Sequence, residues 1–226
     1  MNAAEQRTAL ITGGARGIGA AIATELEARG YQIIAPTRAE MDLGNDESIQ
    51  RWLASASDLK VDVLINNAGI NVLNPLTTLE PQSWQAMLQT NLTGAVRLIQ
   101  AFAPGMQSRG WGRILNLSTI FSLVTKERRG AYSMTKAALN ALTRTAAVEL
   151  GPDGILVNAL APGYVDTDLT RQNNSPEAIA AITATIPLRR LAHPAELART
   201  AAFLVSEENT YLTGQTVIVD GGFICQ

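Results

Sequence analysis

The stretch Thr12-Gly13-Gly14-Ala15-Arg16-Gly17-Ile18-Gly19 lies between a short apolar run at 8–12 and a segment with helical spacing at 17–29. A diphosphate requires close approach to the backbone and is stabilised by the free N–H groups at a helix N-terminus. The glycines at 13, 17 and 19 leave that space open. A glycine-rich turn alone could be an ordinary turn, but its position between a strand and a helix favours a dinucleotide-binding loop.

Strand-like and helix-like segments alternate along the rest of the chain. Apolar or β-type runs lie at 8–12, 32–36, 61–65, 113–117, 155–160 and 216–219. Helical spacing falls at about 46–57, 81–107, 131–150, 176–184 and 194–206. This alternation predicts an α/β fold: one Rossmann-like, doubly wound parallel sheet with helices on both faces. We expect a single domain over 1–226 with about seven strands.

Composition narrows the function classes. The 226 residues are 46% hydrophobic and carry a formal net charge of −2, so no overall positive field favours nucleic acid or an anionic membrane. The single cysteine, Cys225, cannot form an internal disulfide, which suits a reducing compartment. Because residues 1–7 are polar and lack the apolar core of a signal peptide, we expect a cytoplasmic protein.

Four later motifs, together with the glycine-rich loop, match the pattern of a known protein family. With T-G-x-x-x-G-x-G at the start, the chain resembles the short-chain dehydrogenase/reductase family, in its compact single-domain branch, from about residue 7 to 222. The further matching motifs are Asn66-Asn67-Ala68-Gly69, Asn91, Tyr132-Ser133-Met134-Thr135-Lys136 and Pro162-Gly163-Tyr164-Val165-Asp166-Thr167. The resemblance implies hydride transfer between a nicotinamide cofactor and a carbonyl or secondary alcohol.

Tyr132 and Lys136 are the candidate acid/base pair. Residues four apart on a helix share a face, and a nearby ammonium would lower the phenol pKa from about 10. We therefore expect Lys136 to lower the pKa of Tyr132. The resemblance implies that Lys136 also binds the nicotinamide ribose and that Asn91 holds a water of a proton relay.

The third catalytic group departs from the family pattern, which places a serine thirteen residues before the tyrosine. That position is Thr119, and Ser118 precedes it. Both hydroxyls can donate to a carbonyl oxygen, but neighbours in an extended segment point opposite ways, so one should reach the pocket. The spacing favours Thr119. Ser122 also replaces a glycine that is common in the family.

The end of the second strand favours NADP, with NAD as the alternative. Thr37 occupies the position of the acidic residue that binds a free ribose diol, and Arg38 follows it. Arg38 and Arg16 could bind a 2′-phosphate, whereas Glu40 could oppose it. Asp42-Leu43, which resembles the pair beside the adenine, comes so early that we expect the helix between strands two and three to be missing.

The resemblance therefore implies a set of cofactor-binding residues. They are Gly13, Arg16, Gly17, Ile18, Gly19, Thr37, Arg38, Asp42, Leu43, Asn67, Ala68, Gly69, Tyr132, Lys136, Pro162, Gly163, Val165 and Thr167. We expect no metal site. One histidine and one cysteine argue against a zinc-dependent dehydrogenase, and the single histidine, His193, precedes a helix as a structural turn would.

The substrate region is expected after the last of these motifs. Residues 168–187 occupy the place of the family's variable lid, and a wall is expected from Ile120, Phe121, Val124, Thr125 and Tyr164. The run Lys126-Glu127-Arg128-Arg129 is either a solvated loop or a site where Arg128 or Arg129 binds an anionic substrate or carrier.

Helix 131–150 is apolar nearly all round, which predicts a homodimer or homotetramer. Two other functions remain open: a dinucleotide-binding sensor or scaffold without turnover, and a sugar-nucleotide epimerase or dehydratase. Sensors of this kind usually lose the tyrosine or lysine. The epimerases need a larger C-terminal substrate domain than the roughly 60 residues that follow Pro162-Gly163.

Overall fold

A single parallel sheet organises the molecule. The computed structural model describes residues 6–226, apart from the side chains of Leu169 and Asn173. Its six strands are β1 (Thr8–Ile11), β2 (Gln32–Ile34), β3 (Val63–Asn66), β4 (Gly112–Leu117), β5 (Ile155–Pro162) and β6 (Thr216–Val219). They pair in parallel in the order β2-β1-β3-β4-β5-β6, which confirms the doubly wound α/β prediction.

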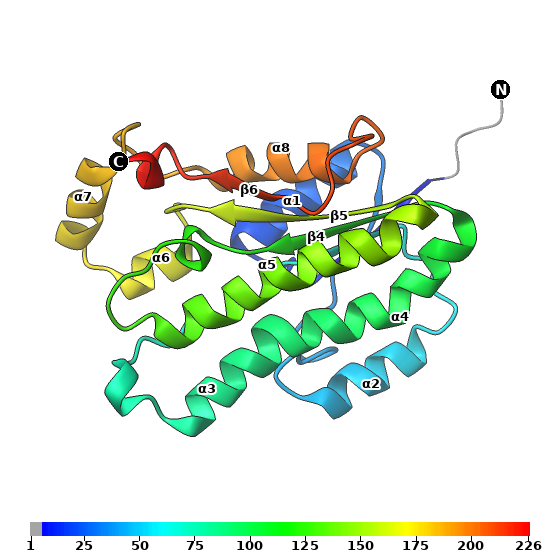
Figure 1. Ribbon diagram of the computed structural model, residues 1–226, viewed down its shortest axis with the longest axis horizontal. Coiled ribbons are helices and arrows are strands. Elements are labelled where there is room, and N and C mark those ends of the chain that lie inside the picture. Colours follow the sequence, from blue (N-terminus) through cyan, green and yellow to red (C-terminus); the bar gives the residue numbers. More distant parts are fainter. Residues whose placement is uncertain (1–5) are drawn as a thin grey trace.

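Helices cover both faces of this sheet (Figure 1). On one face lie α1 (Gly17–Ala28) and α8 (Pro194–Val205), and on the other α4 (Gly94–Arg109) and α5 (Gly130–Leu150). The helix α3 (Pro81–Leu88) runs into α4 through a π-helical turn, Gln89–Thr93, and α2 (Asp46–Ser55) lies beside α4. Strands buried on both faces explain the continuous apolar runs in the sequence.

The sheet has six strands, whereas about seven were expected. Glu40 N and Met41 N donate to Thr37 O at 3.1 and 2.9 Å, so a turn occupies the place of the additional strand. Neither that strand nor a helix before it forms, and the chain passes directly into α2, whose N-terminus is capped by Asn45. The strand β2 is consequently the edge of the sheet.

Two buried apolar clusters hold the layers together. One packs β1, β3 and β4 against α1 and α8 and includes Ile22, Leu26, Leu197 and Val205. The other lies under α4 and includes Leu98, Phe102 and Met106. This two-sided packing fixes the strand ends, from which the site residues project.

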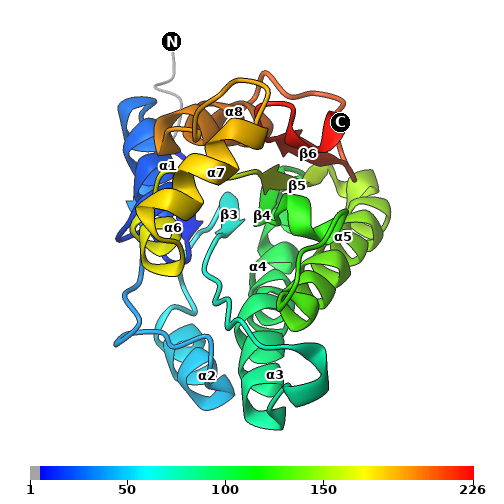
Figure 2. The same cartoon turned by 90° about the vertical axis from the view of Figure 1, so that its left-hand side faces the viewer.

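The carboxyl ends of the strands gather at one end of the molecule. There α6 (Asp168–Asn173) and α7 (Pro176–Thr185) lie in front of the sheet, where the lid was expected (Figure 2). Within residues 6–226, no helix is both long and apolar enough to cross a bilayer. Residues 1–5, on which the expected cytoplasmic location partly rests, lie outside the described residues, so that location stays a prediction.

Candidate active site

The loop between β1 and α1 forms a cradle that only glycine permits. A Cβ on Gly19 would lie 2.3 Å from Gly13 O and 2.4 Å from Asn67 Nδ2, so the backbone segments could not approach as they do. Gly17 has a φ of +57°, which disfavours any side chain. No described side chain caps the first turn of α1, whose N-cap is Arg16. Its N–H groups, with Ile18 among the first residues, therefore suit a diphosphate.

Thr12 joins this cradle to the loop after β3. Its Oγ1 accepts hydrogen bonds from Asn67 N and Ala68 N, each at 3.0 Å. Asn67 Nδ2 in turn donates to Thr12 O at 2.8 Å and to Gly13 O at 3.1 Å. The structure thus brings the predicted residues Gly13, Asn67 and Ala68 together. It also adds Thr12, which the sequence could have indicated because Thr12 directly precedes Gly13.

The loop after β5 also approaches the cradle. Thr167 Cγ2 lies 3.6 Å from the position of a Cβ on Gly17. Gly163 lies against Asp220 so closely that a Cβ would be 2.7 Å from the Asp220 Cα, which explains the glycine after Pro162. Val165 is buried and pairs with Ala192 in an isolated bridge. Thr167 then caps α6.

Glu40 changes the expected ribose end of the groove. Its Oε2 accepts hydrogen bonds from Thr37 N at 2.7 Å and Thr37 Oγ1 at 2.8 Å, and these bonds lower the pKa of the Glu40 carboxyl. The side chain of Arg38 is 83% exposed, and its Nε lies 3.1 Å from Asp42 Oδ2. A carboxylate therefore binds Thr37, directly before the expected cation Arg38.

The expected adenine pair, Asp42 and Leu43, lies in the connection between β2 and α2. The Leu43 side chain is buried against Gly94, where a Cβ would lie 3.3 Å from it. Its carbonyl accepts a hydrogen bond from Gln89 Nε2 at 3.3 Å. Any contact of Leu43 with an adenine would thus use its backbone, while the Asp42 carboxylate also accepts a bond from Gly44 N.

The structure separates the two candidate hydroxyls. Thr119 makes a side-chain hydrogen bond with Tyr132 that lowers the pKa of the phenol. Ser118 Oγ points instead to the carbonyl of Lys136, at 3.5 Å. This opposite orientation agrees with the alternation expected of extended neighbours and favours Thr119 as the hydroxyl beside Tyr132. Ser122 Oγ donates to Thr119 O at 2.6 Å and so supports that loop.

Lys136 is buried beside Tyr132. Its side chain is 3% exposed, and Nζ donates to Leu117 O at 2.5 Å and lies 6.0 Å from the centroid of the Tyr132 ring. Burial lowers the pKa of Lys136 to about 8. Burial also raises the pKa of Tyr132, while the Arg129 guanidinium and the Thr119 hydrogen bond lower it. Arg129 is thus a further cation that favours the phenolate, and the expected effect of Lys136 on Tyr132 stays a prediction.

Asn91 lies in the π-helical turn before α4 and is 2% exposed. Its Oδ1 accepts a hydrogen bond from Ile70 N at 2.8 Å, and its Nδ2 donates to Ile70 O and to Thr135 Oγ1 at 2.9 and 3.1 Å. A Cβ on Gly69 would lie 3.2 Å from Asn91 Oδ1 and 3.4 Å from Lys136 Nζ. Gly69, Asn91 and Lys136 therefore converge. Thr135, which the sequence reasoning missed, also donates to Tyr132 O.

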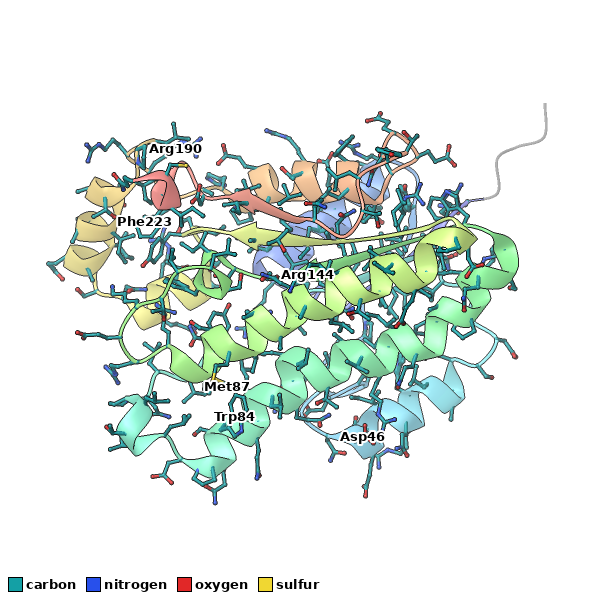
Figure 3. The ribbon with its side chains drawn as sticks, in the orientation of Figure 1. Asp46, Trp84, Met87, Arg144, Arg190 and Phe223 are labelled. Atoms are coloured by element: carbon teal, nitrogen blue, oxygen red, sulfur yellow. The ribbon has the colours of Figure 1, made fainter. Side chains whose placement is uncertain are left out.

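An aromatic row forms part of the wall beside Tyr132. Phe121 and Tyr164 meet edge-to-face at 5.9 Å between centroids, and Tyr164 meets Phe223 in the same way at 5.4 Å. Figure 3 shows Phe223 at the end of the molecule where α6 and α7 lie. Ile120 is fully buried in the interior, whereas Val124 and Thr125 are exposed. The sequence did not indicate Phe223, because no motif links it to Tyr164, which it meets only in the folded chain.

The two arginines before the tyrosine have different surroundings. Arg128 is exposed, with a φ of 66°, and donates to Leu73 O at 3.2 Å. Arg129 is 8% exposed, and its Cζ lies 4.5 Å from the centroid of Phe121. His193 precedes α8 and donates its N–H to Glu196, as expected of a structural turn.

The chain is similar to known proteins over nearly its whole length. Residues 35–224 match the family model described as enoyl-(acyl carrier protein) reductase. The chain is 35% identical to the 3-oxoacyl-[acyl-carrier-protein] reductase FabG of Vibrio cholerae, over 96% of this chain and 97% of that one. It is 37% identical to the acetoacetyl-CoA reductase of Shinella zoogloeoides, over 96% and 98% of the two chains.

A solved structure shares the fold closely. The gluconate 5-dehydrogenase of Burkholderia cenocepacia, determined in complex with NADP and tartrate, superposes with a TM-score of 0.92. It is 31% identical, and the superposition covers 97% of this chain and 96% of that one.

Proposed function

The chain belongs to the short-chain dehydrogenase/reductase family of oxidoreductases, and from that premise we propose its reaction. It transfers a hydride between NADP(H) and a carbonyl or secondary alcohol carbon. The observation that carries this proposal is the position of Lys136 Nζ, 6.0 Å from the centroid of the Tyr132 ring and 3.4 Å from the position of a Cβ on Gly69. Gly69 lies in the loop that Asn67 binds to the glycine cradle.

The chain's own residues provide proton transfer and orientation. Tyr132 donates a proton to the carbonyl oxygen during reduction and accepts it during oxidation, while Thr119 Oγ1 orients that oxygen. Because burial raises the pKa of Tyr132, the phenol is protonated at neutral pH and suits the reductive direction. Lys136, held by Leu117 O, lies next to the phenol and to Asn91, through which protons reach the site.

The groove suits a dinucleotide, which supplies or accepts the hydride when it is bound. Gly13, Gly17 and Gly19 would hold the diphosphate against α1, and Thr167 would cover it. NADP is favoured by Arg38 and Arg16 and by the NADP complex of the Burkholderia relative. Glu40 lowers the strictness of that choice, since its carboxylate binds Thr37.

The direct test is oxidation of NADPH and NADH against a panel of ketones, oxo acids and oxoacyl thioesters. We expect turnover with NADPH, and a fall of roughly 100-fold or more in Tyr132→Phe. Cofactor binding, followed by the fluorescence of NADPH, should persist in that variant. A wild-type protein that binds NADPH but turns over no carbonyl compound would instead be a sensor or scaffold.

A further inference from the structure

Arg129 is a buried cation without an anionic partner. Arg129 is 8% exposed, and among the described residues its guanidinium has no hydrogen bond or ion pair. The guanidinium lies over the ring of Phe121, with Cζ 4.5 Å from the ring centroid. Burying a charge without a paired group is unfavourable, so a buried arginine of this kind indicates a site that a ligand completes.

The position of Arg129 relates it to the reacting group. It precedes α5 directly, three residues before Tyr132, so the start of one helix fixes both side chains. The guanidinium lies over Phe121, which contacts Tyr164 edge-to-face, and its charge lowers the pKa of both Tyr132 and Tyr164. A substrate whose carbonyl oxygen meets Tyr132 would therefore place a neighbouring group beside Arg129.

We propose that Arg129 binds the carboxylate of the substrate, so that the enzyme acts on short oxo acids or the corresponding hydroxy acids. This inference rests on the proposed hydride transfer and names its substrate class. A guanidinium binds a carboxylate through two parallel hydrogen bonds, and the apolar surroundings strengthen that pair.

The charge balance favours a carboxylate over a phosphate group. One guanidinium neutralises a monoanion, whereas a phosphate dianion would need a second cation. Arg128 is exposed and bound to Leu73 O, and Arg171 and Arg190 are paired with Asp166 and Glu196. The exposed Arg189 donates to Ala184 O. Among the described arginines at this end of the molecule, Arg129 is therefore the buried one whose guanidinium has neither an ion pair nor a hydrogen bond.

The kinetic test compares a charged substrate with its neutral analogue. We would measure kcat/KM for acetoacetate and acetoacetamide in wild type, Arg129→Gln, Arg129→Lys and the neighbouring control Arg128→Gln. The ratio of acid to amide should fall by roughly 30- to 1,000-fold in Arg129→Gln, recover partly in Arg129→Lys and stay unchanged in Arg128→Gln. An arginine that only supports the fold would lower both values and leave the ratio unchanged, which would overturn the proposal.

A binding test does not depend on turnover. Ligand-observed NMR with butyrate and butyramide, neither of which has a reducible ketone, should show butyrate binding to wild type and Arg128→Gln. That binding should be at least tenfold weaker in Arg129→Gln. Equal binding of butyrate to all three proteins, or no binding to wild type, would overturn the proposal that Arg129 binds a carboxylate.

The two tests distinguish the two proposals. If the enzyme reduces neutral ketones but neither prefers oxo acids nor binds butyrate through Arg129, the proposed hydride transfer stands and the proposed carboxylate site is wrong. If butyrate binding depends on Arg129 but no carbonyl compound is reduced, the carboxylate site stands and the proposed reaction is wrong.

Discussion

At the scale of single residues, the ionisation of Tyr132 is set by opposing effects. Burial raises the pKa of the phenol, whereas the Arg129 charge and the Thr119 hydroxyl lower it. Lys136 is itself kept partly neutral, since burial lowers its pKa to about 8. The acid/base group therefore depends on Arg129, which lies outside the Tyr-x-x-x-Lys motif.

Removal of the Arg129 charge should shift the pH dependence of alcohol oxidation. Oxidation requires the phenolate, so its rate rises as the pH rises through the pKa of Tyr132. Because Arg129 lowers that pKa, Arg129→Gln should move the rise to higher pH. The measurement is kcat/KM against pH for a neutral secondary alcohol. A profile that stays in place or moves to lower pH would show that Arg129 does not act on Tyr132.

Glu40 offers a second test at this scale. Replacing its carboxylate removes a negative charge from the Thr37 N–H and hydroxyl, where a 2′-phosphate would bind. Glu40→Gln should raise the ratio of kcat/KM for NADPH over NADH by roughly tenfold. Arg38→Gln should lower the same ratio, and the remote surface variant Glu27→Gln should leave it unchanged. A fall of the ratio in Glu40→Gln would place Glu40 outside the phosphate site.

At the scale of elements, the start of α1 depends on the absence of a side chain at Gly19. Gly19→Ala would place a Cβ 2.3 Å from Gly13 O, so either the loop shifts or the fold is strained. We expect a loss of about 1–3 kcal/mol in the free energy of unfolding and weaker NADPH binding. Gly151→Ala is the matched control, because φ there is −56° and nothing lies within 4 Å of the added Cβ. Equal effects of the two changes would count against the cradle.

The elements also show how far the sequence alone can predict. The apolar runs predicted the six strands that form, because burial on both faces leaves a continuous signal. The sequence did not predict the turn at Thr37–Met41, because the hydrogen bonds between Glu40 and Thr37 are local contacts that leave no periodic pattern. Motif spacing singled out Tyr132, Lys136 and Asn91. It favoured Thr119 but did not exclude Ser118, because spacing carries no side-chain direction.

The remaining site features depend on contacts between distant segments. Phe223 joins the wall from the C-terminal end of the chain, through Tyr164. The burial of Arg129 results from packing against Phe121, whereas the three residues before it are charged and exposed. No local pattern separates Arg129 from Arg128, so only the fold could choose between them.

At the scale of the whole molecule, one side of α5 remains uncovered. Val148 is 78% exposed and Met134 is 47% exposed, and Ala137 and Ala141 are exposed between them; Figure 3 shows Arg144 on the same helix. We predict that this side packs against a second copy, giving a dimer or tetramer. Light scattering at micromolar concentration should give a multiple of 24.1 kDa.

A charge on that side should separate the subunits. Ala141→Glu combined with Val148→Glu would bury two carboxylates in the interface, so the mass should fall towards a single chain. Glu27→Lys, an exposed change on α1, is the control and should keep the wild-type mass. A wild-type protein that is already monomeric would contradict the prediction.

The proposed reaction requires Tyr132 to exchange a proton with the carbonyl oxygen while a hydride is transferred to the carbonyl carbon. The most direct measurement uses NADPH carrying two deuterium atoms at the reactive ring carbon, with mass spectrometry of the alcohol that forms. The wild type should place one deuterium on the carbinol carbon, and Tyr132→Phe should form that product at least roughly 100-fold more slowly. A product without deuterium, or equal rates in the two proteins, would contradict the proposed mechanism.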